Sequence, residues 1–440
     1  MLTEFRLKNF KSFQQQASLP LGPLTVLIGA NAAGKSNAIE ALRLLSWLAQ
    51  GNKLGSIQSA VNQGDALIRG RLDDVFRRGE SVFSLGGKLS MPGEPELTIE
   101  VGLRDGELHI VQERLHAAAK WLYQMERPSV GLSTDAGVSY NNFASGPNKP
   151  MVSVSDQMAV FVQLDSPASF QAKHKQAQQK IPLVCRAMQT ILSGILFLDP
   201  VPARMRAASF LVDKRLGGDG SNLSSVLHRL WHDETQETPS PREEILSFIQ
   251  SLPEQDIAGL DFLQGLRGEV MVQLIETFSG EPRRYEAALL SDGTLRVLAI
   301  ASAMLSAPEG SLVVIEEIDN GVHPSRARHL LERIQAVAER RQLRVLLSTH
   351  NPAMLDALPD KAVPDVVFCY RDPVGGDSRL VRLGSLEDGP ELLIQDTLGH
   401  LMTSGALERF VKHHPGPEVR KQKAKAWLAS LKQSRPEAAQ

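Results

Sequence analysis

The sequence LTVLIGANAAGKS, residues 24–36, contains the pattern that decides the fold of this 440-residue chain. Its first five residues are almost wholly apolar, which is typical of a strand buried on both faces of a sheet. Residues 29–36 match the spacing G-x-x-x-x-G-K-[ST] without a mismatch, and a helix is predicted from about Lys35 to Gln50. A buried strand, a glycine-bearing loop and a helix in this order predict a phosphate-binding loop.

The residue types in this loop suit nucleotide phosphates. Gly29 and Gly34 allow the tight turns that point backbone N–H groups at phosphate oxygens, and the following helix directs its positive end at the same point. Lys35 is expected to reach the β- and γ-phosphates, and the Ser36 hydroxyl is expected to ligate Mg²⁺. ATP and Mg²⁺ are therefore the predicted cofactors, and the nucleotide-binding residues expected here are Gly29, Asn31, Gly34, Lys35, Ser36 and Asn37.

A second buried strand, residues 312–315, ends in two carboxylates, Glu316 and Glu317. A phosphate-loop enzyme needs one carboxylate for the metal and its water shell, and a neighbour that orients or deprotonates the attacking water. We therefore expect Glu316 to bind the metal and Glu317 to act as the general base.

A third strand, residues 344–347, leads to His350. A predicted helix over 324–341 separates it from the strand at 312–315, and this β–α–β spacing predicts a parallel sheet with right-handed crossovers. His350 then ends a strand of the same sheet and is expected to face the γ-phosphate, where a hydrogen-bonding imidazole is useful. His323, near the start of the helix, is interpreted as structural.

The charge of the chain limits how it could meet nucleic acid. Lys and Arg number 48 against 50 Asp and Glu, a net charge of −2, so nucleic acid could bind only through a local patch. Residues 409–435 hold eight basic residues against Glu418 alone, a local charge of +7. This basic tail suggests DNA contact, because clustered cations release counterions from phosphates. A solvated or disordered end is the alternative interpretation.

The two cysteines, Cys185 and Cys369, are too few for a disulfide framework or a four-ligand zinc site, which favours a reducing compartment. No apolar run approaches the ~18 residues of a membrane span. The N-terminus reads as a strand and lacks the apolar core of a signal peptide. We therefore expect a cytoplasmic protein with no membrane partner.

Two further segments carry a resemblance to a known family. Residues 5–13, FRLKNFKSF, look like the opening strand and turn of the ABC-type ATPase heads of the SMC, RecF and OLD group, and residues 290–296, LSDGTLR, resemble the ABC signature motif. Physically, the second segment is a serine N-cap and a glycine that open a helix, a second anion site. The resemblance implies that Ser291 and Gly293 act in trans, on the γ-phosphate of a nucleotide held by a second head.

The same resemblance implies roles for the other motif residues. Glu316 and Glu317 fill the Walker B positions, and His350 is the switch histidine. The remaining assignments are Lys11 and Ser12 near the nucleotide, Asp319 in the D-loop, and Gln163 as the Q-loop residue at the metal, with Gln63 as the fallback.

Two residues depart from the family pattern. Asp292 replaces the first glycine of the signature motif, which changes the local charge but leaves Ser291 and Gly293 in place. Glu316 stands where many relatives have aspartate, and its longer arm predicts a shifted metal and slow hydrolysis.

The predicted fold is α/β, an ABC-type P-loop ATPase head with a mixed sheet, an antiparallel β region and a helical insertion. No heptad pattern persists, so a long coiled coil is excluded and the compact branch of the group is favoured. The expected divisions are lobe I with the phosphate loop (1–165), a largely helical insertion (166–265), lobe II with the signature-like motif (266–395) and a basic helical tail (396–440).

The function predicted from these residues is an ATP-binding, ATP-hydrolysing head that forms a homodimer on ATP. Such a head would act as a switch in DNA repair or phage (antiviral) defence, with a separate effector such as a Toprim-type or other nuclease. One alternative is a nucleotide-gated scaffold with little hydrolysis. A second is the ATPase subunit of a membrane transporter, although the β-rich middle of the chain does not suit that class.

Overall fold

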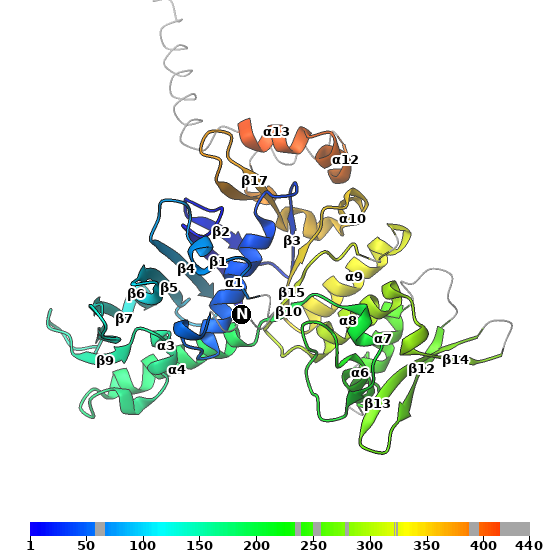
Figure 1. Ribbon diagram of the computed structural model, residues 1–440, viewed down its shortest axis with the longest axis horizontal. Coiled ribbons are helices and arrows are strands. Elements are labelled where there is room, and N and C mark those ends of the chain that lie inside the picture. Colours follow the sequence, from blue (N-terminus) through cyan, green and yellow to red (C-terminus); the bar gives the residue numbers. More distant parts are fainter. Residues whose placement is uncertain are drawn as a thin grey trace, which may run out of the picture.

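The computed structural model describes residues 1–57, 67–233, 239–249, 257–277, 281–320, 322, 324–386 and 396–413. A central sheet lies between a β-rich lobe and a second, helix-rich lobe (Figure 1). Its strands are parallel except the last, in the order β10 (Leu196–Leu198), β15 (Leu312–Ile315), β16 (Arg344–Ser348), β3 (Leu24–Ile28), β17 (Val366–Arg371) and β18 (Ser378–Arg382). Every residue of β3 and β15 is buried, as the apolar runs predicted.

The first lobe contains an antiparallel sheet. Its order is β2 (Ala17–Pro20), β1 (Leu2–Lys8), β4 (Val82–Leu89), β5 (Glu96–Arg104), β6 (Glu107–Ala117), β7 (Lys120–Arg127), β8 (Asp135–Tyr140) and β9 (Met151–Ser155). A tight hairpin turn joins β5 and β6: Asp105 and Gly106 both have positive φ, and Arg104 pairs with Glu107.

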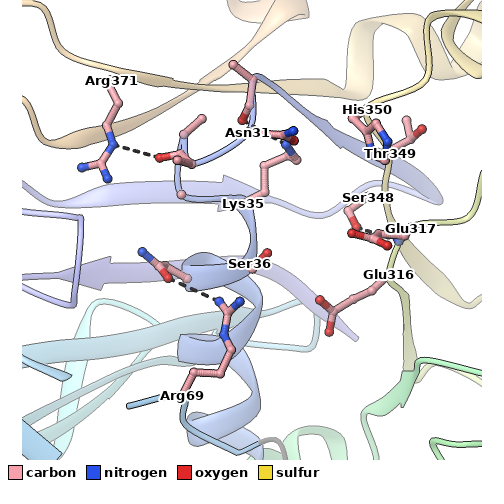
Figure 2. Close-up of a pocket in the computed structure, with 15 residues that line it drawn as sticks. Asn31, Lys35, Ser36, Arg69, Glu316, Glu317, Ser348, Thr349, His350 and Arg371 are labelled. Atoms are coloured by element: carbon pink, nitrogen blue, oxygen red, sulfur yellow. Dashed lines mark hydrogen bonds between the residues drawn. The ribbon is translucent and has the colours of Figure 1, made fainter. Parts of the chain in front are cut away.

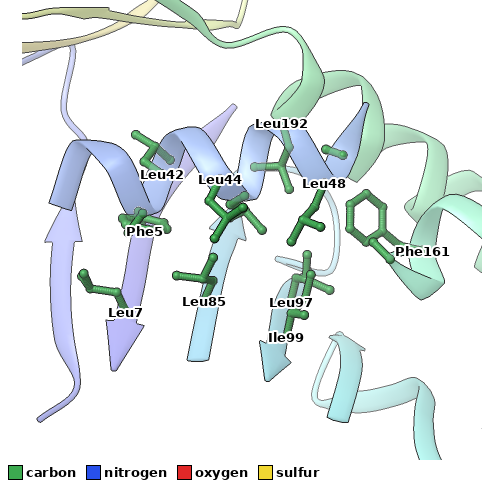
Figure 3. Packing of buried hydrophobic residues seen from close by; sticks show 14 of the residues in the cluster. Phe5, Leu7, Leu42, Leu44, Leu48, Leu85, Leu97, Ile99, Phe161 and Leu192 are labelled. Carbon is green, nitrogen blue, oxygen red and sulfur yellow. The ribbon is translucent and has the colours of Figure 1, made fainter. Parts of the chain in front are cut away.

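Helix α1 (Lys35–Ala49) packs its apolar side against this sheet, together with α3 (Val160–Gln163) and α4 (Lys175–Ser193) (Figure 3). Leu42 and Leu48 of α1 lie over Phe5 of β1 and Leu97 of β5, and all four side chains are buried. This contact anchors the helix that follows the phosphate loop, since burial of each such side chain stabilises the fold by about 1.5–3 kcal/mol.

The second lobe combines a small antiparallel sheet with helices. Its strands are β11 (Ser209–Phe210), β12 (Ile257–Gln264), β13 (Glu269–Glu276) and β14 (Arg283–Glu286). Its helices are α5 (Pro202–Met205), α6 (Leu223–Trp231), α7 (Pro241–Ile249), α8 (Asp292–Ser306) and α9 (Pro324–Arg340). The segment predicted as a helical insertion, 166–265, thus also includes β12 and, in β10, an edge strand of the central sheet.

The last described residues return to the central sheet. Helix α12 (Leu398–Thr403) packs on α10 (Pro352–Asp356) and is followed by α13 (Ala406–His413). The backbone N–H of Gly399 donates to Asp356 Oδ1 at 2.7 Å. Most of the basic tail lies outside the described residues. Among the helices that the structure describes, none is long and apolar enough to cross a membrane.

Glu113 of β6 is a fully buried carboxyl group that joins the antiparallel sheet to α3. It accepts hydrogen bonds from the Tyr123 hydroxyl (2.6 Å) and from the backbone N–H groups of Val160 (2.7 Å) and Phe161 (2.9 Å). Burial raises the pKa of Glu113 to about 7, although the hydrogen bonds act in the opposite direction.

This raised pKa predicts a pH-dependent stability. Between about pH 4.5 and pH 7 the folded chain keeps a proton on Glu113 that the unfolded chain releases, so the contribution of this group to the free energy of unfolding falls as pH rises, by about 3 kcal/mol at most. Glu113→Gln should remove that slope when urea unfolding is measured at intervals from pH 4.5 to 8. It should also add a constant loss, because an amide nitrogen cannot accept from the Val160 N–H. A variant that keeps the wild-type slope would contradict the raised pKa.

Candidate nucleotide-binding and hydrolysis site

The carboxyl ends of β3, β15, β16 and β17 meet at a cavity of about 360 Å³ (Figure 2). Strands far apart in the sequence place their following residues here, because parallel neighbours end at the same edge of a sheet. The cavity is lined by Ala30, Asn31, Ala32, Ala33, Gly34, Lys35, Ser36, Asn37, Arg69, Glu316, Glu317, Ser348, Thr349, His350 and Arg371.

The backbone of the phosphate loop requires its glycines. Gly29 has φ +144° and Gly34 has φ +120°, values that side chains with a Cβ rarely adopt. A Cβ on Gly34 would also lie 2.3 Å from the Ser378 hydroxyl. Gly34 immediately precedes α1, so the backbone N–H groups of the first helical turn are oriented to bind an anion.

Lys35 lies along the loop and contacts its own backbone. Its Nζ donates to the carbonyl oxygens of Gly29 (2.6 Å) and Ala30 (3.2 Å). Burial lowers the pKa of Lys35, while nearby groups including Glu317 act to raise it. The ammonium group is therefore held at the point where the loop would surround a phosphate.

The turn after β1, which contains Lys11 and Ser12, contacts the phosphate loop and the start of α1. Asn37 Nδ2 donates to Ser12 Oγ at 2.8 Å, and Ser378 Oγ donates to the Ala33 carbonyl at 2.5 Å. Lys11 pairs with Glu40 of α1. Ser12 and Lys11, expected near the nucleotide, thus lie next to the loop but outside the cavity lining. The Lys11 ammonium is bound to the buried Glu40 carboxylate of α1, 29 residues away in the sequence, and this ion pair holds it outside the cavity.

Glu316 and Glu317 follow β15 and both line the cavity. Glu316 Oε1 accepts from Arg43 of α1 at 2.7 Å, and burial raises the pKa of Glu316, an effect that Arg43 opposes. Glu317 has φ +49°, a left-handed backbone conformation that costs about 1–3 kcal/mol outside glycine and is held by its surroundings. Its N–H donates to Ser348 Oγ at 3.1 Å, and Asn320 Nδ2 donates to its Oε2 at 2.7 Å.

His350 is linked to the acidic strand end through Asp319. The Thr349 hydroxyl donates to Asp319 Oδ1 at 2.6 Å, and His350 Nε2 lies 3.7 Å from Asp319 Oδ2. The His350 side chain is 49% exposed, on the cavity side of β16. Asp319 therefore restrains the two residues that follow β16.

Several lining residues were not anticipated from the sequence. Arg371 is the last residue of β17 and donates through Nε to the Ala32 carbonyl at 3.0 Å. Arg69 donates to Glu40 of α1 and lies 3.5 Å from Asn37 Oδ1. An isolated arginine belongs to no local sequence pattern, so the sequence could not identify Arg69 or Arg371 as site residues. Ser348 and Thr349 could have been identified, because they directly precede His350 at the end of a strand.

The structure does not bring every expected residue to this cavity. Ser291 caps α8, where its Oγ accepts from Thr294 N at 3.1 Å, and neither it nor Gly293 lines the cavity. Gln163 also lies outside the lining: its amide bonds the backbone of Ser155 and Met158. That placement does not fit the metal contact expected of Gln163. The fallback Gln63, and His323, lie outside the described residues.

The oxygen donors in the cavity fit Mg²⁺. Mg²⁺ is commonly bound by one or two protein oxygens together with water and substrate phosphates. The exposed Ser36 hydroxyl and the Glu316 carboxylate line the same cavity and supply that kind of donor. Within the described part of the chain no group of three or more His, Cys, Asp or Glu could hold a metal ion.

A phosphate loop after a central parallel strand, facing acidic residues after β15 and a histidine after β16, defines a P-loop ATPase head. Two family models match the chain: "AAA ATPase domain" over residues 1–79, and "AAA domain, putative AbiEii toxin, Type IV TA system" over residues 193–356. Over these two segments, which hold the phosphate loop and the residues after β15 and β16, the chain is similar to AAA ATPase domains, and its fold is an α/β head with a mixed and an antiparallel sheet.

Solved SMC heads are among the similar structures. An SMC head bound to the C-winged helix domain of ScpA is 11% identical, with 86% of this chain and 96% of that chain covered and a TM-score of 0.49. The SMC head domain from Thermotoga maritima is 14% identical, covering 87% and 98%, with a TM-score of 0.41. An SMC head with an extended coiled coil, bound to the C-terminal domain of ScpA from Pyrococcus furiosus, is 11% identical, covering 90% and 98%, with a TM-score of 0.45. No curated protein matches the chain.

Proposed function

We propose that this ATPase hydrolyses ATP in a site completed by a second copy of the chain, and that ATP binding drives the formation of the dimer. The observation that carries the proposal is that one chain has two anion-binding features, the phosphate loop and the N-terminus of α8, and that they lie apart. The phosphate loop, Glu317 and His350 share one cavity, whereas the helix N-terminus at Ser291 lies outside it and is exposed.

Within one head, the residues have separable tasks. The N–H groups of the loop and Lys35 bind the phosphates, and Glu317 accepts a proton from the attacking water. His350, restrained through Asp319, hydrogen-bonds the γ-phosphate side of the site. Ser36 and Glu316 would hold Mg²⁺, which when bound neutralises charge on the phosphates.

The partner head would supply the second anion site. Ser291 caps α8, and Asp292, the acidic residue that replaces a glycine in this motif, is paired with Arg206 at 2.6 Å, which offsets part of its negative charge. The N-terminus of α8 is exposed at Ser291 and Asp292, where it presents backbone N–H groups and the positive end of the helix dipole. This is a suitable partner for a γ-phosphate that the other head holds.

The test is the solution mass of Glu317→Gln by light scattering, with and without Mg-ATP. The substitution keeps the size of the side chain but removes the base, so hydrolysis stops while the binding contacts persist. We expect the mass to double with Mg-ATP, and we expect a further Ser291→Arg substitution to prevent the doubling because its bulk and charge occupy the anion site.

The matched control is Ser56→Arg in the Glu317→Gln chain. Ser56 is also an exposed serine, but it follows the far end of α1 from the phosphate loop, so dimerisation should persist. A mass that stays constant in Glu317→Gln, or that doubles in spite of Ser291→Arg, would count against the sandwich dimer.

The biological role proposed for this switch is phage defence or DNA repair, with a separate effector such as a nuclease. The family model over residues 193–356, described as a putative abortive-infection toxin of a type IV toxin–antitoxin system, supports defence over general repair. The basic tail, residues 409–435, supports a contact with DNA.

A further inference from the structure

Arg43 connects the helix of the phosphate loop to the acidic end of β15. It lies eight residues after Lys35, about 12 Å further along α1. From there its guanidinium NH2 donates to Glu316 Oε1 at 2.7 Å, across 273 positions of sequence. The Arg43 and Glu316 side chains are only 22% and 24% exposed.

The surroundings of the guanidinium hold it in this place. Its central carbon lies 5.0 Å from the centre of the Phe197 ring in β10, within the range of a cation–π contact. Glu316 in turn is anchored by its backbone N–H, which donates to the Leu198 carbonyl at 3.2 Å. An arginine that is packed on an aromatic ring and paired to a mostly buried carboxylate loses little freedom by staying there.

The length of the glutamate arm makes the pair possible. An aspartate at 316 would place its carboxylate about 1.5 Å closer to the backbone, beyond hydrogen-bonding distance of a guanidinium held over Phe197. The pair with Arg43 therefore requires the longer side chain of glutamate at position 316.

We propose that Arg43 is a positioning residue that competes with the metal ion for the Glu316 carboxylate, so that it lowers the affinity of the nucleotide-loaded head for divalent metal. This inference rests on the proposed function, because it assumes that Glu316 helps to hold the metal ion that accompanies ATP. A carboxylate oxygen that accepts a charge-assisted hydrogen bond from Arg43 is a weaker ligand for a metal ion. The side chain at 43 acts through Glu316 and need not touch the nucleotide.

The experiment measures the affinity for Mn²⁺, used as a probe for Mg²⁺, by electron paramagnetic resonance on the full chain with a non-hydrolysable ATP analogue. Arg43→Met replaces the guanidinium with a shorter, unbranched apolar side chain that can still pack on Phe197, so the charge and the hydrogen-bond donors are removed. We expect it to bind Mn²⁺ on the order of 3- to 30-fold more tightly, the range typical of coupled contacting residues. Arg43→Lys, which retains the charge, should remain closer to the wild type.

The second arm of the cycle repeats Arg43→Met in a Glu316→Asp chain. Because the shortened carboxylate cannot reach position 43, the effect of Arg43→Met should largely vanish there. Arg204→Met is the matched control: it breaks another arginine–carboxylate pair, with Asp219 at 2.8 Å, outside the cavity, and should leave Mn²⁺ affinity unchanged.

Equal Mn²⁺ affinities of the wild type and Arg43→Met would overturn the proposal. So would an equal gain in the wild-type and Glu316→Asp backgrounds, since that would be an unspecific charge effect. Analogue binding in the presence of EDTA is measured in parallel. A chain that binds the analogue and dimerises, yet shows no effect at position 43, refutes this inference alone, whereas a chain that binds neither analogue nor metal refutes the proposed function as well.

Discussion

Glu317→Gln is expected to lower the turnover number for ATP by about 10²- to 10⁴-fold, the usual contribution of a positioned general base. The affinity for ATP should change little, because the amide preserves the shape of the side chain and the phosphate loop is untouched. Release of phosphate and equilibrium binding of ATP measure the two quantities separately.

The geometry around Glu317 makes this a sharp test. One carboxylate oxygen, Oε2, already accepts a hydrogen bond from Asn320, so we expect Oε1 to take the proton from water. Glutamate and glutamine tolerate a left-handed backbone equally poorly, so we expect no change of main-chain strain in the glutamine variant. Glutamine at this position leaves an oxygen acceptor but cannot take a proton.

The matched control is Glu332→Gln, an exposed glutamate on α9 whose nearest basic partner, Arg328, is 4.0 Å away. It should retain the wild-type turnover. If Glu317→Gln has the same turnover as the wild type, Glu317 is not the general base. The scaffold alternative would be favoured only by a second result, that cells do not need the hydrolysis.

Gly29→Ala is expected to reduce the free energy of unfolding by about 2–6 kcal/mol. A methyl group at φ +144° costs about 1–3 kcal/mol in backbone strain. The new Cβ would also lie 2.1 Å from the backbone oxygen of Cys369 in β17, and overpacking of this kind costs a further 1–3 kcal/mol. The clashing atom belongs to the main chain of the adjacent strand, so the clash cannot be relieved by a change of side-chain rotamer.

Loss of the loop geometry should accompany the loss of stability. The Gly29 carbonyl accepts from Lys35 at 2.6 Å, so a shift of this residue displaces the ammonium group and weakens ATP binding. Urea denaturation and ATP titration of the same preparation measure both effects.

Gly79→Ala provides the comparison. Gly79 has φ +89°, but an added Cβ would meet nothing within 4 Å. It should therefore show the strain alone, with ATP binding intact. Equal losses of stability in the two variants would mean that the contact with Cys369 contributes nothing.

Residues close together in the sequence were predicted well. The strand over 24–28, the helix from Lys35, the helix that Ser291 caps and the parallel pair β15 and β16 are all confirmed. Each is specified by short-range physics: apolar period, a glycine that turns the chain, or an oxygen that satisfies a free N–H. A strand as short as β10 gives no such period, so the sequence predicts a helical segment there.

The sequence by itself determined that the chain has a phosphate loop, where the loop lies between strand and helix, and which acidic and histidine residues end the neighbouring strands. The tertiary structure alone decided how these charges are partnered. Glu40 forms an ion pair with Lys11, and Glu316 forms one with Arg43. Arg371 donates a hydrogen bond to the phosphate loop, 339 residues away in the sequence. Local patterns fix backbone conformation, because turns and periods involve neighbouring residues. A charge pairs with whichever opposite charge the packed sheet and helices bring within about 3–4 Å, and that distance is a property of the whole fold.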